Sequence, residues 1–135
     1  MTVSRSRRDD RGAAAVEFAL VLPILILLLF GIVDFGRMLA AKITITEAAR
    51  EGVRAAALIG ADEGVDRVFA ATTDLNGTVD PPEVIGCPEV PGPDDDATVT
   101  VTYQFEFITP ISLMVGLGGD DGRVELSATG VMACL

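Results

Sequence analysis

The chain has 135 residues, a formal net charge of −10, no histidine and two cysteines. This length accommodates one small domain and a membrane helix, but not two domains with separate cores. Beyond Ala55 two arginines, Arg67 and Arg123, stand against fourteen acidic residues, and so acidic a surface argues against nucleic-acid binding. Histidine and the common nucleophile, P-loop and dinucleotide motifs are absent, so the sequence predicts a protein that is not an enzyme and uses no cofactor.

A short basic leader precedes a long apolar run. The leader contains four arginines, Arg5, Arg7, Arg8 and Arg11. Residues 13–33 are long and apolar enough to cross a hydrocarbon core of ~30 Å as one helix. Basic residues beside a span stay cytoplasmic, so we expect residues 1–12 inside the cell and the acidic part outside. The sequence thus predicts a single-pass protein of the cytoplasmic (inner) membrane.

The start of the span differs from a secretory signal. Small residues, Gly12 to Ala15, come before the apolar run, whereas a secretory signal has its small-residue cleavage site after it. Glu17 lies in the first turns of the span, where an ionisable group is costly and indicates a functional site. Cleavage between Gly12 and Ala13 would create an amine that could pair with Glu17. The alternative is a carboxylate favoured only by the dipole at the helix N-terminus.

The helical pattern continues beyond the membrane, and we expect one helix over residues 13–59. Pro23 removes a backbone donor inside it, which predicts a local kink. Asp34 and Arg37, three residues apart, are expected to mark the exit into water as a simple interfacial pair. Gly60 then ends the helix.

Residues 60–135 are expected to form an acidic extracytoplasmic α+β domain. A short helix is predicted over residues 62–73 and a strand over 83–87. The clearest alternation in the chain predicts a strand over 97–108, and a weaker one predicts a strand over 123–133. The predicted fold is therefore α+β, with a small antiparallel sheet of three or four strands behind the long helix.

Both cysteines, Cys87 and Cys134, lie in the outer part, where an oxidising compartment favours a disulfide. Two unpaired buried thiols are the alternative. The acidic runs Asp94–Asp96 and Asp120–Asp121 lack the alternating spacing of a calcium loop and are interpreted as solvated turns, so no metal site is predicted.

The N-terminal motifs resemble a known family. Residues 11–23 read RGAAAVEFALVLP, residues 31–37 read GIVDFGR, and residues 48–56 read AAREGVRAA. Together they resemble the signature of TadE-like proteins, the pseudopilins or minor pilins of tight-adherence (Flp) pili. The signature residues within it are Phe18, Pro23, Asp34 and Arg37.

The resemblance implies a non-catalytic role in assembling an adhesion pilus, after a prepilin peptidase cuts between Gly12 and Ala13. It also implies three sets of partners: the major Flp pilin, a second minor pilin, and a membrane platform with a secretion ATPase. The alternative is an uncleaved, membrane-anchored binding domain whose sheet holds a ligand.

Overall fold

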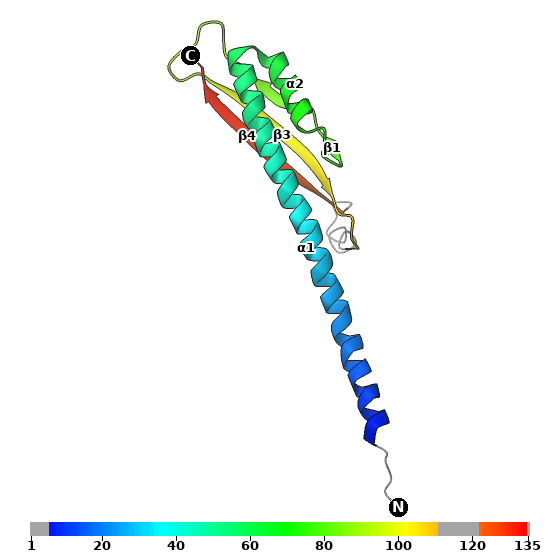
Figure 1. Ribbon diagram of the computed structural model, residues 1–135. Coiled ribbons are helices and arrows are strands. Elements are labelled where there is room, and N and C mark those ends of the chain that lie inside the picture. Colours follow the sequence, from blue (N-terminus) through cyan, green and yellow to red (C-terminus); the bar gives the residue numbers. More distant parts are fainter. Residues whose placement is uncertain (1–5, 111–121, 135) are drawn as a thin grey trace, which may run out of the picture.

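A single long helix organises the molecule, and a small sheet with a second helix packs against its C-terminal half (Figure 1). The computed structural model describes residues 6–110 and 122–134. The predicted α+β class, with a long N-terminal helix, a short helix and an antiparallel sheet, is confirmed. Arg5 of the predicted leader lies outside the described residues.

Helix α1 (Ser6–Leu58) has 53 residues and is therefore about 80 Å long at 1.5 Å per residue. It remains helical through Pro23. Its first half contains one stretch long and apolar enough to cross a membrane, with a mean hydropathy of 2.8, and none of that stretch is buried by the described residues. Its second half is covered on one side by the rest of the protein. The same helix thus has a free apolar half and a half that forms part of a core.

The sheet is built around strand β3 (Asp96–Glu106), which pairs along its whole length with β4 (Arg123–Ala133). Two short strands, β1 (Thr78–Val79) and β2 (Glu83–Ile85), also pair with β3. Because β4 occupies one edge of β3, both short strands lie along the other edge. All pairings are antiparallel, and β1 is the additional strand that the sequence pattern left undefined.

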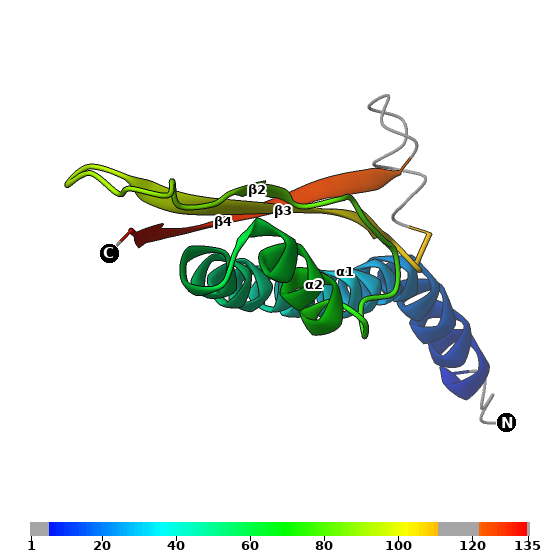
Figure 2. The same cartoon turned by 90° about the horizontal axis from the view of Figure 1, so that it is seen from above.

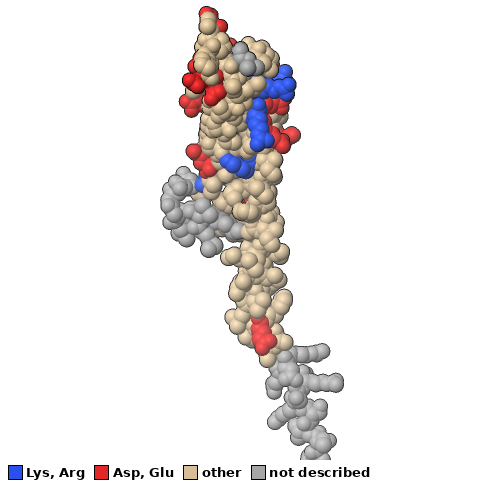
Figure 3. Space-filling view, turned by 90° about the vertical axis from the view of Figure 1, so that its left-hand side faces the viewer, with Lys and Arg blue, Asp and Glu red and all other residues tan. Residues whose placement is uncertain are grey.

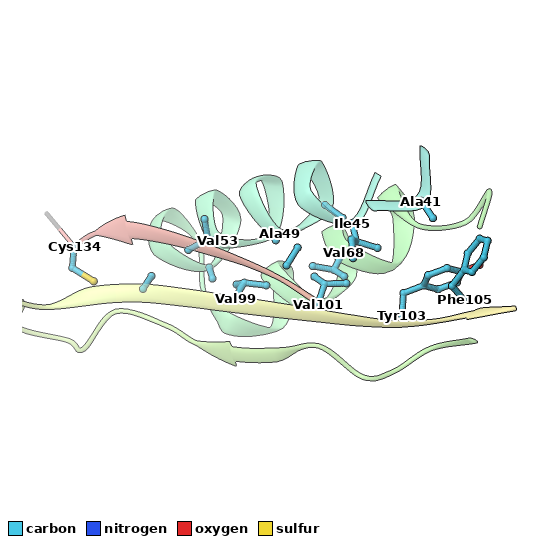
Figure 4. Packing of buried hydrophobic residues seen from close by; sticks show 14 residues of the cluster. Ala41, Ile45, Ala49, Val53, Val68, Val99, Val101, Tyr103, Phe105 and Cys134 are labelled. Atoms are coloured by element: carbon cyan, nitrogen blue, oxygen red, sulfur yellow. The ribbon is translucent and has the colours of Figure 1, made fainter. Parts of the chain in front are cut away.

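The core lies between one face of the sheet and the two helices, while no described element covers the opposite face of the sheet (Figure 2). Helix α2 (Ala61–Ala71) packs against α1 and contributes Val68. Alternate residues of β3 are buried, as its pattern predicts, and they meet small and branched side chains of α1 (Figure 4). The largest fully buried side chains are Asp34, Ile45, Val68, Val99, Val101, Tyr103 and Phe105.

Glycines let α1, α2 and β4 approach one another closely. A Cβ atom at Gly52 would stand 2.6 Å from the side chain of Val68, and one at Gly64 would stand 2.9 Å from Ala56. On the sheet side, a Cβ atom at Gly130 would stand 2.5 Å from the carbonyl oxygen of Ala49. These distances are too short for a real side chain, so glycine at these positions sets the spacing of α1, α2 and β4.

The outer edge of β4 carries one contact from α1. Ser127 lies opposite Thr102 in the sheet, and the carbonyl of Thr102 accepts a hydrogen bond from Asp80, on the side away from β4. In an antiparallel pair the backbone groups of Ser127 therefore point away from β3, toward the free edge. There the Lys42 ammonium donates a hydrogen bond to the carbonyl oxygen of Ser127.

Substituting Gly130 by alanine tests this close packing. We expect Gly130→Ala to lower the free energy of unfolding by about 1–3 kcal/mol, because the added methyl group must push β4 away from α1. Thermal and denaturant unfolding of the full chain in detergent would measure the change. The matched control is Gly36→Ala on the exposed side of α1, where no heavy atom lies within 4 Å of the new Cβ. It should be neutral or stabilise by about 0.5–1 kcal/mol, and equal destabilisation by both substitutions would contradict the packing argument.

Candidate functional site

The predicted cleavage site lies in the accessible first part of α1. Gly12 and Ala13 are exposed, and no heavy atom lies within 4 Å of a Cβ built on Gly12. Both residues are helical, so the backbone there would have to unwind locally to enter a peptidase site. Nothing in the described part of the protein covers this bond.

Glu17 is the single charged residue among residues 13–33 and is exposed on α1. The space-filling view shows an acidic group on a shaft that otherwise carries neutral side chains (Figure 3). Phe18 beside it has 63% of its surface exposed. No described side chain forms an ion pair with Glu17, which leaves the carboxylate available to a group from outside this chain.

Asp34 is a buried acidic residue, although it lies directly after the apolar span. Only 1% of its surface is exposed. Its carboxylate accepts hydrogen bonds from the backbone N–H groups of Ile108, at 3.3 Å, and Thr109, at 3.4 Å. The Thr109 hydroxyl donates a further bond to it. Asp34 therefore fastens the chain just after β3 to α1, at the membrane-proximal end of the sheet.

Arg37 contacts the same end of β3 from the next turn of α1. Its guanidinium lies 3.4 Å from the Asp34 carboxylate and donates to the carbonyl oxygen of Glu106, also at 3.4 Å. The guanidinium also lies over the Phe105 ring, 5.3 Å from its centre. Asp34 and Arg37 together hold the segment 106–109. We use the name membrane-proximal latch for these two residues and that segment.

The sequence-based prediction of an interfacial pair exposed to water is wrong for Asp34. The i, i+3 pair with Arg37 exists, but its main partners lie 74 and 75 residues further along the chain. Pairing within a helix can be predicted from spacing, whereas contact with a distant loop depends on how the sheet packs. The one usable signal was an acid beside a long apolar run, which has to be either solvated or fully hydrogen-bonded.

The latch also changes the acidity of Asp34. Burial by itself raises the pKa of the carboxyl group, but the hydrogen bonds that it accepts, from Thr109 above all, outweigh burial. The net pKa lies below the ordinary value of 3.8. A lowered pKa in the folded state means that folding favours the charged carboxylate.

The second fastening lies at the other end of the sheet. Cys87 and Cys134 form a disulfide with a Cα–Cα distance of 5.7 Å, and no described cysteine is free. The bond joins the segment after β2 to the end of β4, far from the N-terminus (Figure 1). The predicted pairing is therefore present, and the alternative of two free thiols does not hold.

Potential metal ligands do not cluster among the described side chains. Within residues 6–110 and 122–134 no group of three or more acidic, cysteine or histidine side chains could hold a metal ion. Asp94–Asp96 is exposed, and the side chain of Asp95 accepts a hydrogen bond from the N–H of Gly92, as in a solvated turn. Asp120 and Asp121 lie outside the described residues.

Comparison with known proteins addresses the N-terminal motifs directly. The model of the TadE-like protein family matches residues 12–54. The resemblance is confirmed over this helix. The TadE-like segment starts at Gly12, includes Glu17, Asp34 and Arg37, and ends within α1, so the match does not extend to α2 or the sheet. The match covers about a third of the chain and shows what this helix is similar to. No curated protein and no solved structure matches the chain.

We predict that Asp34→Asn in the TadE-like helix loosens the latch. The amide keeps the size of the side chain but loses the charge and faces two N–H donors with one oxygen, so we expect a loss of about 1.5–3 kcal/mol in unfolding free energy. Hydrogen exchange at Ile108 and Thr109 and unfolding of the full chain in detergent would measure it. Asp66→Asn, an exposed acid on α2, is the matched control and should have little effect.

The same variant tests the pH dependence. Since the folded-state pKa lies below 3.8, the contribution of Asp34 is complete above that pH and is lost as pH falls through the folded value. The wild type should therefore lose more stability than Asp34→Asn on acidification below about pH 3.8. If wild type and Asp34→Asn lost the same stability on acidification, protonation of Asp34 would not be linked to folding.

The disulfide should contribute substantially to the stability of so small a sheet. With a sequence separation of 47 between the cysteines, the chain-entropy argument gives about 4 kcal/mol. We expect Cys134→Ser to lower protease resistance and abundance while leaving membrane insertion intact, as judged by carbonate extraction and limited proteolysis. Reduced wild type is the control, because it should behave like the variant. Equal protease resistance of oxidised and reduced protein would refute a stabilising role.

Proposed function

We propose that this chain is a non-catalytic minor pilin or pseudopilin that takes part in assembling a Tad/Flp-type adhesion pilus after cleavage between Gly12 and Ala13. The observation that carries the proposal is the TadE-like match, which begins at Gly12, immediately before the apolar stretch. A peptidase acting at the cytoplasmic face would meet this bond where the leader enters the membrane. Cleavage there would leave a mature chain that begins with its membrane helix.

The orientation follows from charge. Arginines precede the span, which favours an N-terminus inside the inner membrane and the acidic domain outside. The disulfide supports this placement, since such bonds persist in oxidising compartments outside the cytoplasm. The sheet and α2 would then be presented on the outer side of the membrane.

Assembly would use the exposed side of α1. Beyond the span, Phe35, Leu39 and Ile43 lie one turn apart and are 62%, 53% and 52% exposed. They prolong the apolar surface of the membrane helix into a region where water would surround an isolated subunit. Covering such a side chain completely is worth roughly 1.5–3 kcal/mol, so neighbouring helices are favoured as its cover. We expect these neighbours to be the major Flp pilin and a second minor pilin, gathered on a platform driven by the secretion ATPase.

Glu17 has a distinct role in this proposal. After cleavage the Ala13 ammonium would have to enter apolar surroundings, and a carboxylate four positions further on would offset part of that cost. The partner can come from the same chain or from a neighbouring subunit. The exposed position of Glu17 is compatible with both.

Processing is the first test. Co-expression with the cognate prepilin peptidase should remove the residues up to Gly12, as measured by intact mass and N-terminal sequencing. Gly12→Ala, or a bulkier residue, should slow the cut, whereas Gly36→Ala in the same helix should not. A full-length chain under all these conditions would instead favour the second candidate, an uncleaved anchor that presents the uncovered face of the sheet as a binding surface.

Glu17→Gln is the second test. The substitution keeps size and hydrogen bonding but removes the charge, so insertion and cleavage should remain while incorporation into the pilus machinery fails. Removing one partner of a desolvated ion pair costs roughly 3–5 kcal/mol, whereas a carboxylate that interacts only with the helix dipole contributes at most about 1 kcal/mol. Surface piliation and crosslinking to partner subunits, at equal membrane levels, provide the readout. If Glu17→Gln gave wild-type piliation, Glu17 would interact only with the dipole at the helix N-terminus.

A further inference from the structure

Most basic side chains beyond the apolar stretch lie on helices α1 and α2 rather than on the sheet. Figure 3 shows a band of basic groups along this part of the molecule, with acidic groups to either side. Helix α1 supplies Lys42, Arg50 and Arg54, and α2 supplies Arg67. The uncovered face of the sheet lies on the opposite side of the domain (Figure 2).

An open groove lies at the end of this band, between α1 and α2. It has a volume of about 310 Å³ and is lined by Glu51, Arg54, Ala55, Leu58, Ile59 and Arg67. Leu58 and Ile59 are 63% and 70% exposed, which is high for large apolar side chains. The groove therefore combines positive charge with unprotected apolar surface, and we call it the α1–α2 groove.

The arginines around the groove are only partly neutralised. Arg67 lies 3.1 Å from Glu63 and 3.9 Å from Glu51. Arg50 and Arg54 are exposed, one turn apart, and neither has an ion pair or a hydrogen bond with another side chain in the described ranges. A partner that fits this groove brings a carboxylate for Arg54 and an apolar side chain for Leu58.

The uncovered sheet face offers that combination. Glu83 and Ile85 of β2 are exposed on it, and Ile85 is 57% exposed. Thr98 of β3 pairs with Ile85 on one side and with Val131 of β4 on the other. Val131 is 60% exposed. An acid beside two apolar side chains thus faces outward on the side opposite the α1–α2 groove.

The two surfaces also lie at the same level along α1. The Ala49 carbonyl of α1 touches the backbone at Gly130, which pairs with Val99 of β3, and Val99 pairs with Val84 of β2. Glu83 and Ile85 flank Val84, so they stand at the level of Arg50 and the turn that follows it. Copies anchored in one membrane through the proposed span share their direction and their level. Side by side, they bring the groove of one opposite the sheet face of the next.

We infer that the α1–α2 groove is a self-association site, which binds the outer sheet face of a second copy through Arg54 with Glu83 and through Leu58 with Ile85 and Val131. The contact joins two different surfaces of the same chain, so it can repeat from copy to copy instead of closing after two. This inference rests on the membrane anchoring that the proposed function includes.

Photo-crosslinking in membranes tests the contact. A photoreactive amino acid replaces Leu58 in one full-length copy, and a second copy carries a different tag. Irradiation of envelope membranes should link the two tags, and mass mapping should place the link on β2 or on Val131. Arg54→Glu in the first copy should lower the yield about tenfold, the equivalent of 1.4 kcal/mol. Glu83→Arg in the second copy should restore it.

The matched control is Arg123→Glu, the same change of charge at the other end of β4, where Arg123 forms an exposed ion pair with Glu106 at 3.0 Å. It should leave the yield unchanged. An equal loss with Arg123→Glu, failure of Glu83→Arg to restore the link, or a link to another protein would each overturn the self-association site. Normal processing and piliation without a self-link would remove this site and leave the proposed function intact. A self-link in an unprocessed chain would support the site and count against the function.

Discussion

One surface of α1 holds the whole acidic domain, and the position of every other element depends on how closely the chain can approach it. Between Ala41 and Ala56 this surface consists mainly of alanine, valine and isoleucine, and it is almost completely buried. Short side chains and Gly52 allow α2 and β4 to lie against the helix backbone itself. The C-terminal half of α1 is therefore the central part of a core, while no described residue covers the apolar stretch in its N-terminal half.

Burial on α1 begins at Asp34, although Phe35, Leu39 and Ile43 remain exposed beyond it. Before Asp34, the helix exposes leucine, isoleucine and phenylalanine side chains. Asp34 itself is buried. A carboxylate at that point is stable because the loop after β3 supplies its hydrogen bonds and Arg37 lies beside it. The motif that identifies the helix as TadE-like thus includes residues that attach a domain outside the matched segment. This explains how residues in an N-terminal signature can matter for the C-terminal sheet.

The sequence was sufficient for the elements whose patterns are local. Strict alternation from Val99 to Phe105 predicted both the strand and its buried face, and the apolar run predicted the span. Strand β1 was not predicted because two residues carry no period. Its position depends on β2, which continues along the same edge of β3 beyond Pro81 and Pro82. The role of Asp34 could not be predicted, because its partners are distant in sequence. The α1–α2 groove combines residues of two helices whose crossing angle no pattern encodes.

The bond from Lys42 to Ser127 has a consequence for proteins crowded in one membrane plane. Strand β4 is eleven residues long, and its outer edge pairs with no described strand, which makes it a template for adding a foreign strand. A lysine that occupies a carbonyl in the middle of that edge breaks the row of free acceptors and places a charge where an incoming strand would have to lie. In the proposed membrane-anchored subunit, this contact would oppose sheet-to-sheet aggregation, and it leaves the helical side and the sheet face free for the proposed assembly.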